Sequence, residues 1–257
     1  MRMTSPAANS LGRYVTDTGS LDEGTEVVRS SYAGVAFKVG AYLLVTLVAA
    51  VLGSWWLFTA TDTFVIVALI AGPLVALIAG IIALRVPSTS AVLGSVYCLF
   101  YGLAIGAIAA ILEWVGYGGL VLMALLCTVI VAGVMSLLYF SGTVKVGSKF
   151  KRVVFTAIIA LVLSQLMFFL LSLFIPSVSA FMAFSDGFFW IQLAVCSLMI
   201  IFAACMILID LDHITAVVEE GLGKKYEWRA AFSLMITLIW LFMQILRFLL
   251  LIASKRR

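Results

Sequence analysis

The sequence predicts an all-α integral membrane protein with seven transmembrane helices. Of its 257 residues, 65% are hydrophobic and only 11% are charged, and the mean hydropathy is +1.23. An ordinary soluble domain carries about a quarter charged residues, so most of this chain suits hydrocarbon better than water. Within a bilayer, only helices or a closed barrel satisfy every backbone N–H and C=O. The alternating segments of about ten residues that barrel strands require do not occur in the sequence.

Residues 1–34 are expected to form a polar, flexible tail ahead of a transmembrane domain over residues 35–257. The tail mixes acidic and basic side chains with Gly, Ser and Thr. It shows no short apolar core followed by a cleavage site, as a secretory signal would. We therefore expect the tail to be retained.

Seven apolar stretches have about the 20 residues that a helix needs to cross the hydrocarbon. The predicted spans are residues 35–58, 64–84, 91–111, 120–140, 154–175, 188–209 and 231–253. Polar or turn-forming residues separate them. In chain order these joints are Asp62, RVPST at 85–89, EWVGYGG at 113–119, SGTVKVGSKFKR at 141–152, PSVSAFMAFSDG at 176–187 and EEGLGKKYEWR at 219–229.

The basic residues favour an amino terminus on the cytoplasmic side. With that orientation the inner segments hold 12 of the 16 Lys and Arg residues, and the three outer loops hold none. The positive-inside rule counts Lys and Arg in short loops. The terminal SKRR disagrees, because seven crossings place it outside. Either the last helix does not cross fully or these charges are tolerated after translocation, and we favour the second.

Signatures of enzymes and of metal or nucleotide sites are absent from the sequence. Cys98, Cys127, Cys196 and Cys205 lie in apolar spans without CxxC or Cys/His ligand spacing. The only histidine is His213, and no GxSxG, HExxH or P-loop pattern occurs. We expect no catalytic residues, no cofactor and no nucleic-acid partner, and the lipid bilayer as the main surroundings.

The seventh span carries a polar stripe. Ser233, Thr237 and Gln244 fall close to one face of a helix, with Trp240 beside them. Polar side chains of a membrane helix face protein or water rather than lipid, which predicts a central seventh helix surrounded by the other six. The alternative is that the hydroxyl groups bond back to carbonyls of their own helix.

Two carboxylates close the sixth span. Asp210 and Asp212 are about 200° apart on a helix, so they cannot share one face. A charged Asp inside a span costs about 2.5 to 3.5 kcal/mol, which favours a partner or a water-filled cavity for Asp210. Asp212 and His213 lie nearer the basic inner surface, where we expect solvation. These residues alone leave open whether Asp210 marks the end of a span or forms a gate.

Several segments resemble the Bax inhibitor-1/YccA family, in its bacterial YccA-like branch. They are ILIDLDHI at 207–214, KKYEWRAAFSLMITLIWLFMQILRFL at 224–249, and YGLAIGAIAAILE at 101–113, which ends at Glu113. The resemblance implies a multi-pass protein of the bacterial inner membrane in which six helices surround the seventh. We expect a monomer or a small homo-oligomer.

Relatives of this fold are described as pH-sensitive calcium leak channels with a closed inner gate. The resemblance implies that Asp210 is the sixth-helix acid of such a gate and that Arg85 interacts with it. Thr237 stands where the family has a second acid. Two neighbouring carboxylates share a proton and titrate in coupled steps, which one Asp facing a Thr cannot do. Asp210 would also bind Ca²⁺ weakly, since calcium takes six to eight oxygen ligands.

From the resemblance we expect a pH-influenced cation leak channel that passes calcium, with Asp210, Arg85 and Thr237 at its gate. Secondary candidates are Asp212, Glu113 and Gln244, and Asp210 is a weak candidate metal ligand. The alternative function is a non-conducting regulator. YccA-like members are associated with a membrane-anchored AAA protease that they restrain, and residues 1–30 would offer that protease an exposed end.

Overall fold

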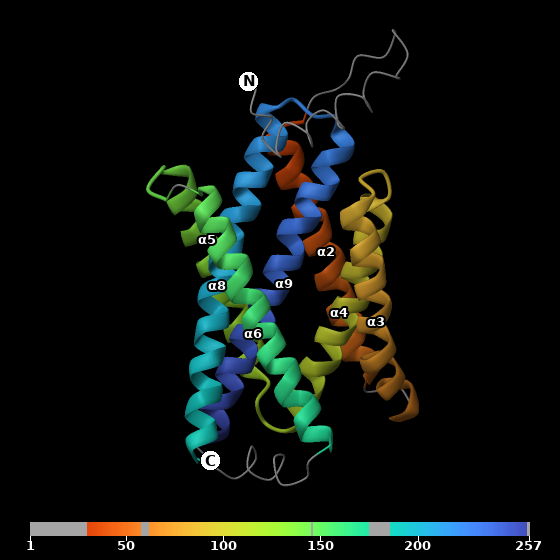
Figure 1. Cartoon of the computed structure of the whole chain (residues 1–257). Helices are drawn as coiled ribbons and strands as arrows, with labels where there is room; N and C mark the ends of the chain where they lie inside the picture. Colours follow the sequence, from red (N-terminus) through yellow and green to blue (C-terminus); the bar gives the residue numbers. More distant parts are fainter. Residues whose placement is uncertain (1–29, 58–61, 145, 175–185, 256–257) are drawn as a thin grey trace.

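A computed structural model describes residues 30–57, 62–144, 146–174 and 186–255 of the protein. Over these residues the chain forms seven α-helices and no strand (Figure 1), which confirms the predicted all-α class. The tail at residues 1–30 was expected to engage a protease. Residues 1–29 of it lie outside the described part of the chain. The helices are α2 (Tyr32–Leu57), α3 (Asp62–Arg85), α4 (Ser90–Trp114), α5 (Gly119–Phe140), α6 (Ser148–Phe174), α8 (Asp186–Glu219) and α9 (Lys224–Lys255).

Each predicted span corresponds to one helix, and α8 and α9 extend furthest beyond the spans that the hydropathy indicated. Six of the seven are long and apolar enough to cross a membrane, and the described segment Ala71–Arg85 of α3 is also apolar. The sixth helix, α8, continues past Ile209 to Glu219 and includes both aspartates. The last helix, α9, begins at Lys224, ahead of the predicted residue 231. Hydropathy predicts where a span leaves the hydrocarbon. A helix can continue past that point, because its backbone hydrogen bonds also form in water.

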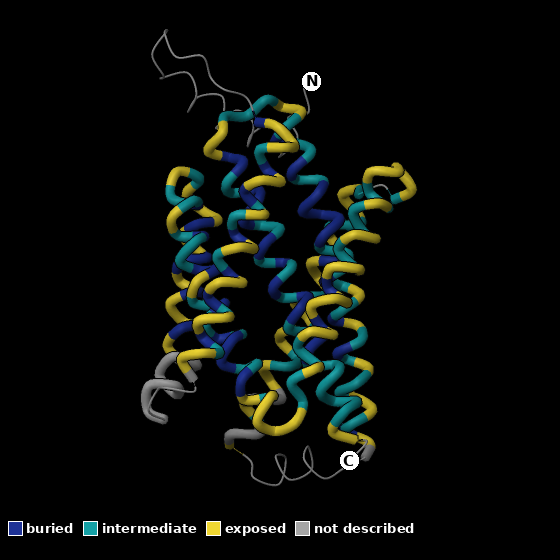
Figure 2. Tube along the Cα trace, turned by 180° about the vertical axis from the view of Figure 1, so that it is seen from behind, coloured by how far each residue is buried: buried dark blue, intermediate teal, exposed yellow. Residues whose placement is uncertain are grey.

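Helix α9 lies at the centre of the bundle. It packs against α2, α3, α4, α5 and α8, and Arg247 on α9 donates a hydrogen bond of 2.8 Å to Gln165 on α6. Phe232 and Leu241 on α9 are completely buried. Buried segments are concentrated inside the bundle and exposed residues cover its outer surface (Figure 2). The predicted arrangement of six helices around a central seventh is therefore confirmed.

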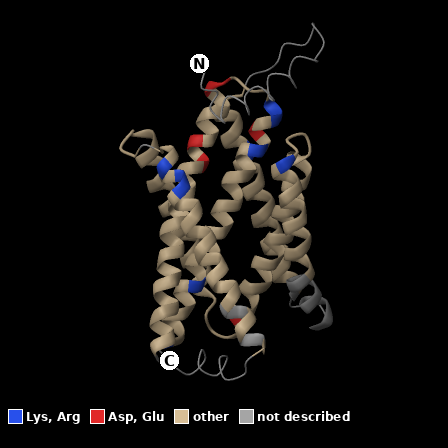
Figure 3. Ribbon diagram, in the orientation of Figure 1, with Lys and Arg blue, Asp and Glu red and all other residues tan. Residues whose placement is uncertain are grey.

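Most of the described lysines and arginines gather at one end of the bundle (Figure 3). We call this the basic end; α2 begins there, and α8 joins α9 there (Figure 1). The carboxyl terminus lies at the opposite end, where the Lys255 amine is 4.3 Å from the ring centre of Phe189. With 32 residues, α9 is about 48 Å long, more than the roughly 30 Å of hydrocarbon. This length agrees with a last helix that crosses fully.

Buried polar contacts join α2 to α9 at the basic end. Glu227 is 1% exposed, and its carboxylate pairs with the Lys38 amine. The same carboxylate accepts a 2.8 Å hydrogen bond from the backbone N–H of Ser31. The Ser30 hydroxyl donates to the carbonyl of Leu222 in the α8–α9 joint. A buried ion pair is costly to break because one charge is left without compensation, so these contacts fix the start of α2 against α9.

Helices α2 and α4 approach closely at glycines. A Cβ added at Gly106 would lie 2.0 Å from the carbonyl oxygen of Ala50, and one added at Gly102 would lie 2.5 Å from that of Thr46. Both obstacles are backbone atoms, which cannot turn aside as a flexible side chain can. Small residues at such positions let membrane helices pack backbone to backbone.

We predict that Gly106→Ala destabilises the protein by about 3 kcal/mol or more, because the new methyl group forces two packed helices apart. Gly133→Ala is the matched control: Gly133 lies in α5, and an added Cβ meets no atom within 4 Å. Thermal unfolding in detergent should show a lower midpoint for Gly106→Ala alone. Equal midpoints for the two variants would contradict this description of the α2–α4 contact.

Candidate functional site

Asp210 lies on the face of α8 that is turned toward α9. Its side chain is within the bundle, since the residue is 4% exposed, and α8 continues beyond it by more than two turns. Asp210 therefore does not mark the end of a helix. An ionisable residue that faces the interior of a membrane bundle is by default a candidate functional residue.

Both carboxylate oxygens of Asp210 accept hydrogen bonds from α9. The Ser233 hydroxyl donates to Oδ1 at 2.6 Å, and the Thr237 hydroxyl donates to Oδ2 at 2.5 Å. Ser233 and Thr237 are four residues apart, so they stand one above the other on the same face of the helix. Thr237 is also 3.4 Å from the carbonyl oxygen of Ser233, but its single proton favours the shorter contact to the charged group. The two hydroxyls thus link α9 to α8 and do not serve only their own helix.

The expected pairing of Asp210 with Arg85 is not found. Arg85 is the last residue of α3, its side chain is exposed, and among the described residues it forms no ion pair. The reason is the position of α3, which packs mainly on α4 and makes its other main contact with α9. Arg85 thus lies at the basic end but outside the contact made by Asp210.

Arg229 is a basic residue beside this site that was not among the predicted candidates. It lines a pocket of about 310 Å³ together with Leu84, His213 and Ser233. Since Ser233 also binds Asp210, the pocket adjoins the carboxylate on the side of the basic end. A signal was available in the sequence, because Arg229, Ser233 and Thr237 are spaced by four residues and continue one stripe along α9.

The neighbouring candidates on α8 have different surroundings. Asp212 pairs with Lys151 of α6 at 2.5 Å, and both side chains are partly exposed, 30% and 38% respectively. Solvent screens such a pair, so it contributes little to stability. His213 is half-buried, and its Nδ1 has no hydrogen-bond partner among the described residues. The expectation that both side chains are solvated therefore holds only in part, because α6 covers Asp212 on one side.

The remaining candidates lie away from Asp210. Gln244 is about two turns further along α9 from Thr237, and its Oε1 is buried without a described partner. Arg247, one turn beyond, binds Gln165 of α6, whose Nε2 also lacks a described partner. Arg247 was not among the basic residues assigned to the inner segments, and it was not predicted to be a site residue. Glu113 is exposed near the end of α4, where its carboxylate lies against Gly118 in the loop before α5.

The oxygen atoms at Asp210 could contribute only weakly to a calcium site. Its two carboxylate oxygens and the hydroxyls of Ser233 and Thr237 are the polar atoms brought together. Calcium prefers six to eight oxygens and several carboxylates. Over the described ranges, no group of three or more His, Cys, Asp or Glu side chains is placed to hold a metal ion.

Comparison with known proteins agrees with this architecture. No curated protein matches the chain. A family model described as Bax inhibitor 1 like matches residues 7–254, and this range includes Asp210, the α9 stripe and all seven described helices. Because the match extends over nearly the whole chain, the protein belongs to the Bax inhibitor 1-like family.

Proposed function

We propose that the protein is a cation leak channel of the membrane whose pathway follows α9 and closes at the Asp210 contact. The observation that carries the proposal is a buried carboxylate with both oxygens bound to hydroxyls of the central helix. An acid placed inside a membrane bundle costs free energy, so its retention favours a role in binding or moving ions. The proposal includes calcium as the ion.

A line of polar side chains along α9 supports this proposal. It runs from Arg229 through Ser233, Thr237 and Gln244 to Arg247. From Arg229 to Arg247 the helix spans 19 residues and rises about 27 Å, which is nearly the thickness of the hydrocarbon. Three buried polar atoms near this line have no hydrogen-bond partner within the described chain: His213 Nδ1 beside Arg229 at the basic end, and Gln165 Nε2 and Gln244 Oε1 toward the other end of the line. Such atoms do not favour a dry apolar setting.

Apolar residues interrupt the line in its middle. Between Thr237 and Gln244, the side chains nearest this face of α9 are Trp240, which packs against the core, and Leu241, which is completely buried. A hydrophobic constriction of this kind excludes water and so blocks ions until the helices move. We therefore regard this arrangement as the closed state. Weak coordination at Asp210 suits a leak, since a conducted ion must leave its site as readily as it enters.

In the proposed orientation the basic end faces the cytoplasm, and the protein lies in a bacterial inner membrane as a member of the YccA-like branch. Eight described Lys and Arg residues support this orientation. They are Lys38, Arg85, Lys149, Lys151, Arg152, Lys224, Lys225 and Arg229. A positive surface of this kind is retained on the cytoplasmic side.

A fluorescent reporter fused after Ser148, at the basic end, should read as cytoplasmic, because the charges next to it are retained on that side. The matched fusion after Tyr117, in the loop between α4 and α5 at the opposite end, should read as external. At each position, fluorescence of the fused reporter indicates the cytoplasmic side. Activity of a phosphatase fused at the same position indicates the external side. A cytoplasmic signal from both fusions would contradict the proposed crossings.

Asp210→Asn should raise calcium flux in proteoliposomes that contain a calcium dye. An amide can accept at one oxygen only and carries no charge, so one of the two contacts to α9 is lost. A hydrogen bond to a charged group is worth about 1.5 to 3 kcal/mol, which corresponds to roughly a tenfold or greater increase in the open population. Asp212→Asn is the control, because this neighbouring acid contacts Lys151 and not α9.

Equal flux from wild type, Asp210→Asn and Asp212→Asn would contradict a gate at Asp210. A complete lack of flux from every variant at every pH would contradict conduction itself and favour the protease-restraining alternative. Deletion of residues 1–29 separates the two functions, since it should leave flux intact and abolish binding of a membrane-anchored AAA protease.

Thr237→Asp should make the leak steeply dependent on pH. The new carboxylate would face Asp210, and two acids at this distance hold one shared proton at lower pH. As pH rises through about 6 to 8, loss of that proton leaves two like charges that repel, so flux should increase with pH. His213 and Arg229 line the adjoining pocket in every variant, and Thr237→Asn, which adds no acid, is the control. A Thr237→Asp profile that matches Thr237→Asn would rule out the coupled pair.

A further inference from the structure

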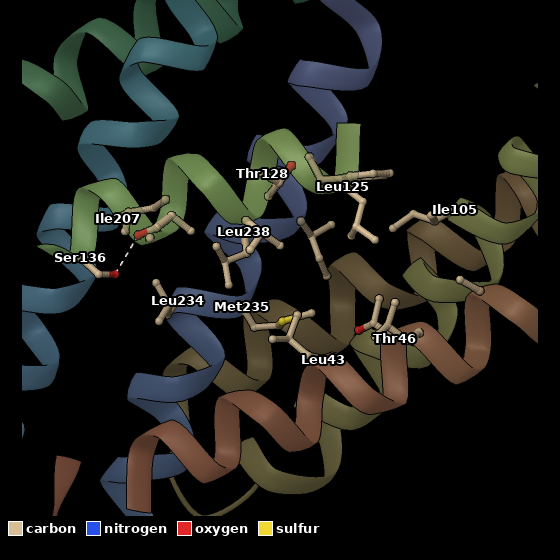
Figure 4. A pocket seen from close by; sticks show the side chains of 17 residues that line it. Leu43, Thr46, Ile105, Leu125, Thr128, Ser136, Ile207, Leu234, Met235 and Leu238 are labelled. Atoms are coloured by element: carbon tan, nitrogen blue, oxygen red, sulfur yellow. Dashed lines mark hydrogen bonds between the residues drawn. The ribbon is translucent and has the colours of Figure 1, made fainter. Parts of the chain in front are cut away.

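A second pocket opens on the side of the bundle, away from the polar line on α9. It measures about 410 Å³ and lies between α2 and α5, with α9 as its floor (Figure 4). Leu47 and Val129 stand at its rims and are 52% and 63% exposed. In a membrane bundle, large exposed apolar side chains face lipid, so the pocket opens into hydrocarbon.

The lining offers no free hydrogen-bond donor to a polar ligand. Three hydroxyl groups reach it, on Thr46, Thr128 and Ser136. Each donates to a carbonyl of its own helix, at 2.9, 2.7 and 2.8 Å respectively. All other lining side chains are apolar. A water molecule needs two to four polar partners, so neither water nor a polar solute is suited to this space.

The size of the pocket distinguishes between the apolar occupants that a membrane provides. An α-helix is about 10 Å across and rises about 5.4 Å per turn, so one turn fills roughly 400 Å³. The pocket of about 410 Å³ would therefore admit no more than a single turn of a partner helix. A linear hydrocarbon chain is narrower and can extend along the groove, and it restores contacts that an empty cavity would lose.

The basic end of the pocket is suited to a lipid headgroup. There the rings of Tyr32 on α2 and Phe140 on α5 meet edge to face, with centroids 6.5 Å apart. Ser136 lines the pocket one turn from Phe140, so the cavity begins next to this aromatic pair. Both rings are exposed, as aromatic residues at the membrane–water boundary are. The lysines and arginines at this end attract an anionic phosphate.

We propose that this pocket binds one acyl chain of a phospholipid from the leaflet at the basic end. The chain lies between α2 and α5 and packs on Met235 and Leu238 of α9. Ile207 of α8 also lines the pocket, one turn before Asp210. The bound chain therefore touches the turns of α8 and α9 that form the Asp210 contact. This binding does not depend on ion conduction.

Gly133→Phe should abolish the site, because Gly133 lines the pocket and an added Cβ there meets no atom within 4 Å. Val134→Phe is the control, since Val134 is 49% exposed on the same helix and does not line the pocket. The full chain, freed of lipid in detergent, is titrated with dioleoyl phosphatidylglycerol and observed by native mass spectrometry. Wild type and Val134→Phe should hold one tightly bound lipid, and Gly133→Phe should hold it at least tenfold more weakly.

Equal lipid retention by all three proteins would overturn the proposal. So would loss of a dimer, rather than of a lipid, in Gly133→Phe, because that result assigns the groove to a second copy. Tighter binding of free oleate than of the phospholipid would overturn the headgroup assignment.

A diazirine analogue of leucine in place of Leu47, which lines the pocket and is 52% exposed, tests the same site without filling it. After irradiation in nanodiscs and a delipidating wash, residue 47 should carry a phospholipid adduct. The same probe at position 48, whose native Val48 is 51% exposed and does not line the pocket, should carry little. Equal adducts at the two positions would overturn a retained chain.

Discussion

Polar groups on α9 must be kept from hydrocarbon, and the rest of the bundle depends on that constraint. A lone helix with Glu227, Ser233, Thr237 and Arg247 along its length would expose each of them to lipid. Enclosure by the other helices gives these groups partners: Lys38 from α2, Asp210 from α8 and Gln165 from α6. The outward surfaces of the surrounding helices can then be almost wholly apolar.

The contact at Asp210 differs in kind from an ion pair. Hydroxyl groups satisfy the oxygens without neutralising the charge, so the carboxylate remains the electrostatic feature of the interior. The pocket beside Ser233 brings Arg229 and His213 close to that charge from the basic end. An ion pair would hold the helices through attraction between opposite charges. Two hydroxyl hydrogen bonds hold them only while the donor–acceptor distances and angles are kept. Such a contact yields to a small shift of α9 against α8.

The two sides of α9 serve different surroundings. One face presents Ser233 and Thr237 to Asp210, and the other presents Met235 and Leu238 to an opening that faces lipid. These residues share two turns of one helix, so the hydroxyls that hold Asp210 lie on the opposite side of the same helical segment from the pocket.

The sequence by itself determined the helical class, the seven apolar helices and the central position of α9. These follow from hydropathy and from the spacing of Ser233 and Thr237, which depend on local composition and helical period. The pairing of Asp210 with Thr237 was implied by the family resemblance and not by residue spacing. Only the tertiary structure decided that Arg85 lies outside the contact and that Arg229 adjoins it, because the packing of α3 on α4 sets where a helix end falls. The lipid-facing pocket likewise depends on the gap between α2 and α5, and no residue pattern along one chain encodes the distance between two helices that are far apart in sequence.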